Sequence, residues 1–216
     1  MHGVAAWKRV TDSVHDATEG GGVIFAQLFA FGRSADPAVA AREGFDGVEI
    51  MAGYGYLLDS FLQDATNQRE DAYGGNIENR SRLLHGVMQA VVEAVGGPER
   101  VGVRLSPWSA FQGMGMADPI PQFSDVVVKA KDLNLAFIHL IEARVSGFDD
   151  VAQEKQGQNM EFAYSLRRDG TFLAAGGTGF GVQDKTRTTS HSLPPGQILL
   201  RRKSCRYIGR LHDVSR

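Results

Sequence analysis

Five short apolar segments are the feature that most limits how this chain can fold. Glycine, proline or charged residues bound each of them, and they lie at 23–28, 45–50, 100–107, 135–142 and 171–177. Stretches with a helical period separate these segments. Apolar strands that alternate with helices along a chain are typical of a parallel sheet covered by helices. The sequence therefore predicts an α/β fold.

The clearest helix is predicted at 77–95, where apolar residues recur with a period of three or four. Asn76 stands immediately before it as a candidate N-cap, and Gly96-Gly97-Pro98 ends it. Two further helices are expected, at about 4–18 and 121–133, and a very short one is the most that fits around 38–42. These helices would carry the chain from each strand to the next.

A closed β/α barrel is the commonest enzyme fold built from repeated strand and helix units. Such a barrel takes eight strands and ~250 residues, whereas only five strands are evident in residues 1–181. We therefore expect an incomplete TIM-type barrel. An incomplete barrel leaves unpaired strand edges, which are sites for pairing with another chain.

Charge divides the chain into two parts. Residues 1–181 carry 15 basic and 23 acidic side chains, a net charge of −8, whereas residues 182–216 carry 8 basic and 2 acidic ones, a net charge of +6. The second part lacks the interleaved aromatic residues and motifs of a nucleic-acid-binding arm. We expect a partial barrel at 1–181, followed at 182–216 by a basic tail without fixed structure and with no nucleic-acid partner.

Cysteine and histidine usage restricts the compartment and the chemistry. Cys205 is the only cysteine, so no internal disulfide can form, and the six histidines have no metal-ligand spacing with cysteine or carboxylate residues. No segment has the ~20 consecutive apolar residues of a membrane span, and the first ten residues lack a signal peptide's apolar region. These features predict a cytoplasmic protein that binds neither membranes nor metal ions.

Three segments carry a resemblance to a known family. Residues 69–82 contain the pattern R-x-D-x-Y-G-G-x-I-E-N-R-x-R, with GFDGVEI at 44–50 before it and RVGVRLSPW at 100–108 after it. These segments resemble the old yellow enzyme family of FMN-dependent NADPH dehydrogenases and ene-reductases, and the resemblance covers about 4–178. HLIEARVSG and QLFAFGR are most similar to the fungal branch that includes the ergot-alkaloid enzymes acting on chanoclavine-I aldehyde.

The resemblance implies a fold, two cofactors and a set of binding residues. FMN would lie across the carboxyl ends of the barrel strands, NADPH would reduce it, and the flavin would pass hydride to an enal or enone. By this resemblance Gln27 would hydrogen-bond the edge of the isoalloxazine, and Arg104 would lie beside its N1–C2 carbonyl. Gly176 and Gly177 would bring backbone N–H groups to the FMN phosphate.

The chain departs from the family where the substrate carbonyl is held. The family motif H-x-x-N-G-Y is replaced by Met51-Ala52-Gly53-Tyr54-Gly55-Tyr56, so only Tyr56, at the proton-donor position, remains. A thioether has no proton to donate, and Tyr54 is the one candidate left for a substrate-binding donor. The resemblance therefore implies a degenerate, inactive homologue associated with fungal alkaloid metabolism. Two alternatives stay open: a weakly active reductase or isomerase that uses Tyr56, and a non-catalytic chain that pairs with itself or with a full-length relative.

Overall fold

The computed structural model describes residues 2–17, 21–28, 44–143, 145–146, 149–150, 158–175, 197–202 and 205–210. Within these ranges, no helix combines the length and hydrophobicity that a membrane span requires.

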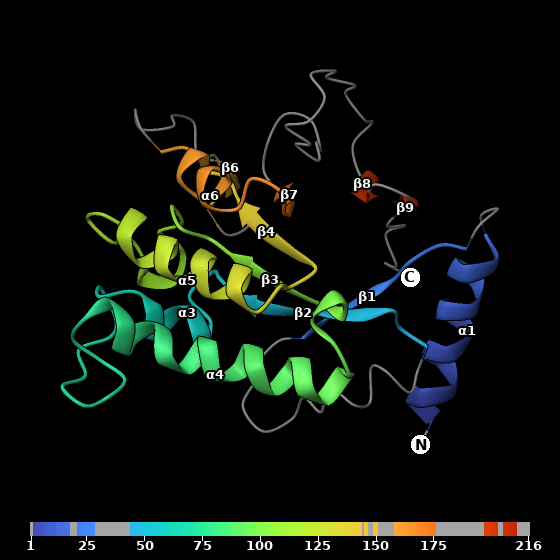
Figure 1. The fold of residues 1–216 in the computed structure, drawn as a ribbon, viewed down its shortest axis with the longest axis horizontal. Coiled ribbons are helices and arrows are strands. Elements are labelled where there is room, and N and C mark those ends of the chain that lie inside the picture. The colour runs from blue at the N-terminus through green and yellow to red at the C-terminus, as the bar shows by residue number, and fades with distance from the viewer. Residues whose placement is uncertain are drawn as a thin grey trace.

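One five-stranded sheet forms the centre of the molecule (Figure 1). Its strands are all parallel and lie in the order β1-β2-β3-β4-β7. They are β1 (Phe25–Leu28), β2 (Gly47–Ala52), β3 (Val101–Leu105), β4 (Phe137–Ile141) and β7 (Thr171–Ala175). Each falls within or close to a predicted segment, so the α/β class and the incomplete barrel of five parallel strands are confirmed.

The three longer predicted helices are present. They are α1 (His2–Asp16), α4 (Ile77–Val95) and α5 (Ile120–Asp132). Sequence periodicity missed two six-residue helices, α3 (Leu57–Leu62) and α6 (Glu161–Leu166), because six residues make less than two turns. Short 3-10 turns, η1 (Pro98–Arg100) and η2 (Phe111–Gly113), lie on either side of β3. The short helix considered around 38–42 lies outside the described residues.

The ends of α4 follow from local sequence. The Asn76 side chain accepts a hydrogen bond from the Asn79 N–H at 2.9 Å, which caps the first turn. At the other end Gly96 has φ of 84°, a left-handed conformation that glycine adopts without a Cβ clash. Both predicted boundaries of this helix are therefore confirmed.

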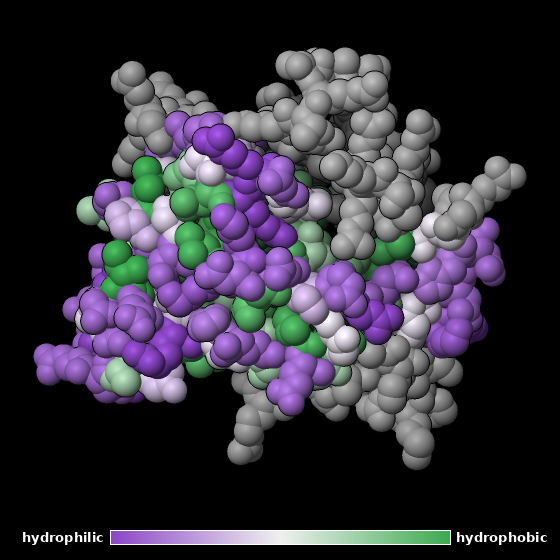
Figure 2. Space-filling view, in the orientation of Figure 1, coloured by the Kyte–Doolittle hydropathy of each residue, from purple (hydrophilic) through white to green (hydrophobic). Residues whose placement is uncertain are grey.

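The main core lies between the sheet and the helices on its outer face. Alternate side chains of β2 and β3 point into it, and α4 and α5, which lie side by side in Figure 1, cover them. The core residues from these four elements are Val48, Ile50, Ala52, Leu84, Met88, Val91, Val95, Val101, Val103, Leu105, Phe123, Val126, Val127 and Ala130. Figure 2 shows a mainly hydrophilic surface with separate hydrophobic patches on the side of the molecule where α4 and α5 face the viewer.

Two short antiparallel pairs stand outside the main sheet. One joins β5 (Val145–Ser146) to β6 (Asp149–Asp150). The other is a hairpin of β8 (Gln197–Arg202) and β9 (Cys205–Arg210). This hairpin lies in the region for which the sequence predicted a tail without fixed structure, so part of that region has a strand pattern that we did not anticipate. The boundary between a partial barrel at 1–181 and the tail remains a prediction.

Candidate flavin-edge site

A row of polar side chains crosses the face of the sheet opposite the main core. Since Val48, Ile50 and their neighbours point toward the helices, the side chains that alternate with them point to the other face. Four adjacent strands place Gln27, Glu49, Arg104 and His139 there, and the backbone register pairs Gln27 with Glu49 and Arg104 with His139. We call these four residues the inner polar row.

Glu49 is the centre of the inner polar row. It is only 7% exposed, and it accepts hydrogen bonds from Gln27 Nε2 and, at 2.7 Å, from His139 Nδ1. Burial by itself raises the pKa of Glu49. The hydrogen bond and charge of His139, the Gln27 hydrogen bond and the Arg104 charge together outweigh burial and hold that pKa below its usual range. Glu49 is therefore an ionised carboxylate at neutral pH.

Arg104 adds a guanidinium charge to the row. Its guanidinium carbon lies 5.5 Å from the centre of the Tyr54 ring, a cation–π distance. Its Nε is buried and has no hydrogen-bond partner among the described residues. A buried N–H without an acceptor costs free energy. A ligand carbonyl or an anionic ring nitrogen would satisfy it, so this donor fits the edge of a flavin.

The turn that follows β2 has a strained conformation. Tyr54 has φ of 57°, which is uncommon for a residue other than glycine, and Gly55 continues the left-handed turn with φ of 74°. The Tyr54 N–H donates to Ser106 Oγ at 2.7 Å. A Cβ on Gly53 would come within 2.8 Å of the same hydroxyl oxygen, so the turn packs directly against the end of β3.

A buried carboxylate holds this turn from the other side. Asp59, in the first turn of α3, is 0% exposed and accepts from the Gly55 N–H at 2.8 Å and from Gln63 Nε2 at 2.9 Å. Gln63 Oε1 in turn accepts from the Gly115 N–H at 2.8 Å. Burial raises the pKa of Asp59 to about 6, against the lowering effect of its donors, which include Ser106. Asp59 thus connects the turn after β2, through Gly55, to the turn after β3, through Ser106.

The structure brings several predicted site residues to the carboxyl ends of neighbouring strands. Met51 is paired in register with Arg104 and is only 2% exposed, and Tyr56 is the half-buried N-cap residue of α3. Gln27 reaches the same face from β1, where it remains exposed. Gly176 and Gly177 lie outside the described residues, so their predicted contact with the FMN phosphate remains a prediction.

Sequence reasoning missed three polar residues of this region: Glu49, Asp59 and His139. A signal was available for two of them, because Glu49 and His139 interrupt otherwise apolar strands that should be buried, and a charged side chain there requires a partner. No local pattern distinguished Asp59 from an exposed residue in the first turn of a helix.

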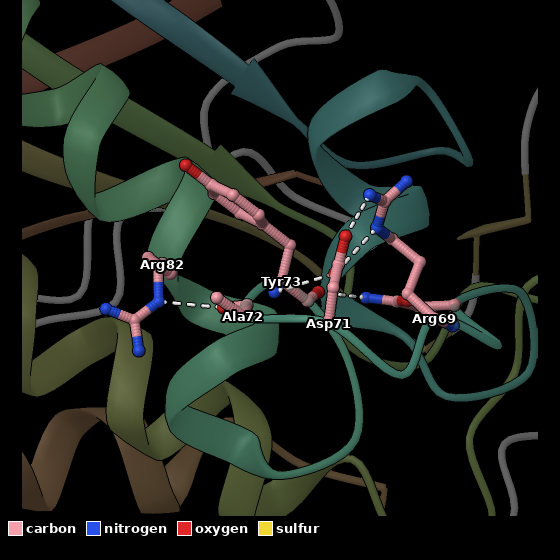
Figure 3. Close-up of polar contacts among 6 residues, drawn as sticks. Arg69, Asp71, Ala72, Tyr73 and Arg82 are labelled. Atoms are coloured by element: carbon pink, nitrogen blue, oxygen red, sulfur yellow. Dashed lines mark hydrogen bonds and ion pairs between the residues drawn. The ribbon is translucent and has the colours of Figure 1, made fainter.

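The segment that carried the resemblance has a structural role here. Figure 3 shows Arg69 directed at the Asp71 carboxylate, with which it forms an ion pair, while Arg82 of α4 donates to the Ala72 carbonyl at 2.8 Å. Asn67 donates to the Tyr73 carbonyl, also at 2.8 Å. These contacts fix the connection between α3 and α4, and they place none of its side chains in the inner polar row.

Among the residues that the structure describes, no three histidine, cysteine, aspartate or glutamate side chains form a group that could hold a metal ion.

Comparison with known proteins identifies the family. The profile described as the NADH:flavin oxidoreductase / NADH oxidase family matches residues 24–190, which is more than half of the chain. The chain belongs to this family. Membership confirms the resemblance found in the sequence, and FMN is the cofactor of this family.

Fungal members of the family are similar to this chain. Chanoclavine-I aldehyde reductase fgaOx3 of Penicillium roqueforti is 42% identical to this chain over 193 residues. The match covers 68% of this chain and 51% of the relative. A Claviceps purpurea protein named "Probable inactive dehydrogenase easA" is 35% identical over 222 residues, covering 81% of this chain and 57% of the relative. The chain thus spans about half the length of the curated relatives that it matches.

Solved structures of the family agree with the partial barrel. The old yellow enzyme homologue from Zymomonas mobilis superposes with a TM-score of 0.65 and 29% identity, and the match covers 85% of this chain and 62% of that one. Old yellow enzyme from Pichia gives a TM-score of 0.64 at 30% identity, with 81% and 56% covered.

Proposed function

We propose that this chain is a non-catalytic member of the FMN-dependent NADPH oxidoreductases, associated with fungal alkaloid metabolism of the ergot type. It retains side chains suited to the flavin edge but has lost the donors that hold a substrate carbonyl. The observation that carries the proposal is the state of the two donor positions. Met51 is a buried thioether, and the Tyr54 ring lies against the Arg104 guanidinium in a left-handed turn. The fungal relatives named as inactive support the same conclusion.

The residues of the inner polar row fit the cofactor of the family. Gln27 and Arg104 would hold the flavin edge, because an exposed amide and a buried guanidinium N–H face the same side of the sheet, and the described residues offer that N–H no acceptor. Reduced by NADPH, FMN supplies the chemistry of hydride transfer to the activated double bond of an enal or enone, and by our proposal this chain would hold the group without completing that transfer. Gly176 and Gly177 are the residues we assign to its phosphate.

By the resemblance, Tyr56 is the residue that would donate a proton to the substrate in this site. It occupies the N-cap position of α3, and its neighbour Gly55 donates its N–H to Asp59. This fixed position favours a second candidate function, a weakly active reductase or isomerase in which the Tyr56 phenol protonates the substrate. Without donors on the carbonyl oxygen, however, the developing negative charge would be unstabilised, and each such donor is worth about 10²–10³ in rate.

The two candidate functions differ in the step in which an enal oxidises the flavin. We expect FMN-loaded protein, reduced chemically without oxygen, to stay reduced when trans-2-hexenal is added and to regain its visible flavin absorbance when oxygen is admitted. Reoxidation by the enal, abolished by Tyr56→Phe, would contradict the inactive assignment and establish the weak enzyme. If the enal reoxidises the flavin only in the double variant Met51→His/Tyr54→Asn, the loss of catalytic activity is due to those two positions.

We also propose that this chain pairs with another protein chain and that it is cytoplasmic. Pairing with a second copy or with a full-length relative is supported by β1 and β7, which are the end strands of the five-stranded sheet in the described part of the chain. Light scattering during gel filtration would measure the mass and test this pairing. A cytoplasmic location is supported by the single cysteine.

A further inference from the structure

The hydrogen-bond polarity of Gln27 is determined by its neighbour. An amide side chain can present either its carbonyl oxygen or its NH₂ group to a ligand, whereas an ionised carboxylate can only accept. Glu49 is held in its ionised form by His139 and Arg104, so the group that Gln27 turns toward it must be the Nε2 donor. The Gln27 carbonyl oxygen is then the end that remains for a ligand.

Arg104 has the opposite polarity in the same row. A guanidinium only donates hydrogen bonds, and its buried Nε has no partner among the described residues. Gln27 and Arg104 stand on strands separated only by β2, and the register offsets them by two residues, so their backbones lie roughly 12 Å apart on the sheet. Their side chains thus offer an acceptor and a donor to one ligand edge. The complementary edge is a cyclic imide, in which an N–H lies between carbonyl groups.

We propose that Glu49 is a positioning residue that fixes Gln27 as an acceptor, so that the inner polar row selects ligands with an imide N–H. The inference rests on the proposed function in one respect, since the pyrimidine ring of FMN is the expected source of this edge. A uracil nucleotide carries the same edge and is the other source of the same chemistry.

The test compares FMN with FMN methylated at N3, which keeps both carbonyl groups but has no imide N–H. For the wild-type protein we expect binding of the methylated flavin to be about 10- to 100-fold weaker, because the Gln27 carbonyl would lose its donor. Fluorescence titration gives both dissociation constants. The quantity compared below is the dissociation constant of the methylated flavin divided by that of FMN.

The variant Glu49→Gln tests whether the methylated flavin binds weakly because of the hydrogen-bond polarity of Gln27 or because the shape of the site excludes the methyl group. The new amide can face Gln27 with either its oxygen or its NH₂ group, so Gln27 is no longer fixed as an acceptor, and the ratio should fall to about 3-fold or less. Both flavins lose the same charge interaction in this variant, so the change of charge cancels in the ratio. The exposed Glu70→Gln serves as the matched control and should keep the wild-type ratio. A ratio that stays high in Glu49→Gln means that shape excludes the methyl group, and it overturns the proposal.

Further measurements keep the proposal falsifiable if Glu49→Gln does not fold. Gln27 is exposed on an end strand, so Gln27→Met should fold, and it should lower the ratio to about 3-fold or less by removing the acceptor. An unchanged ratio in that variant overturns the proposal. Binding of uridine monophosphate but not FMN would support the imide selection and refute the flavin function. Binding of neither at millimolar concentration overturns both.

Discussion

Replacement of Phe123 by alanine is expected to lower the free energy of unfolding by about 3–5 kcal/mol. Phe123 is 0% exposed and is the largest of the fully buried side chains in the core between α5 and the sheet. Truncation removes its transfer free energy and leaves a cavity that the surrounding core side chains fill only partly. Urea unfolding of the wild type and the variant measures the difference.

A matched control lies on the same helix. Val128 is 37% exposed, so Val128→Ala should change stability by about 0.5 kcal/mol or less. If Phe123→Ala and Val128→Ala have equally small effects, α5 does not pack on the sheet as described, and the partial barrel lacks its main core.

Acid is expected to stabilise the protein through Asp59. The pKa of this carboxyl in the folded state is about 6, above the ordinary value of 3.8, so between these values the folded state binds more protons than the unfolded state. Stability from this group is therefore fully present below pH 3.8 and is lost as the pH rises through about 6. Lowering the pH from 7.5 to 4.5 should add about 2 kcal/mol from Asp59 alone.

Comparison with a variant isolates this contribution from the other titrating groups. In Asp59→Asn the pH-dependent gain should disappear, so the difference in unfolding free energy between wild type and variant should change by about 2 kcal/mol over that range. Asp64→Asn, at an exposed position two residues beyond α3, should keep the wild-type dependence. A difference between wild type and Asp59→Asn that does not vary with pH would show that Asp59 is not buried against the turn after β2.

The sequence was sufficient for the main elements of the fold. Apolar runs bounded by glycine and charge located all five parallel strands, and the Asn76 cap with Gly96 located both ends of α4. The six-residue helices α3 and α6 escaped because such short helices depend on tertiary contacts more than on local pattern. The β8–β9 hairpin escaped because the net charge of +6 at 182–216 indicated a tail without fixed structure.

The site was predicted less completely, for a physical reason. Gln27 and Arg104 were identified by resemblance, and the structure places both in the inner polar row. Glu49 and His139, separated by 90 residues in the chain, become partners only when β2 and β4 flank β3 in one sheet. The role of Asp59, on α3, likewise depends on Ser106, which approaches it from the turn after β3. The polar residue in an apolar strand indicates that a partner is needed, but a single sequence carries no local sign of which residue that partner is.

The central claim is that this chain keeps the flavin edge of its family while lacking the carbonyl donors. The most direct test is to purify the protein with added FMN, desalt it by gel filtration and record visible absorbance across the protein peak. We expect a flavin band that co-elutes with the protein and is at least about tenfold weaker in Arg104→Met, since the buried donor is lost. A colourless wild-type peak would contradict the claim and would mean that Gln27 and Arg104 no longer form a flavin site.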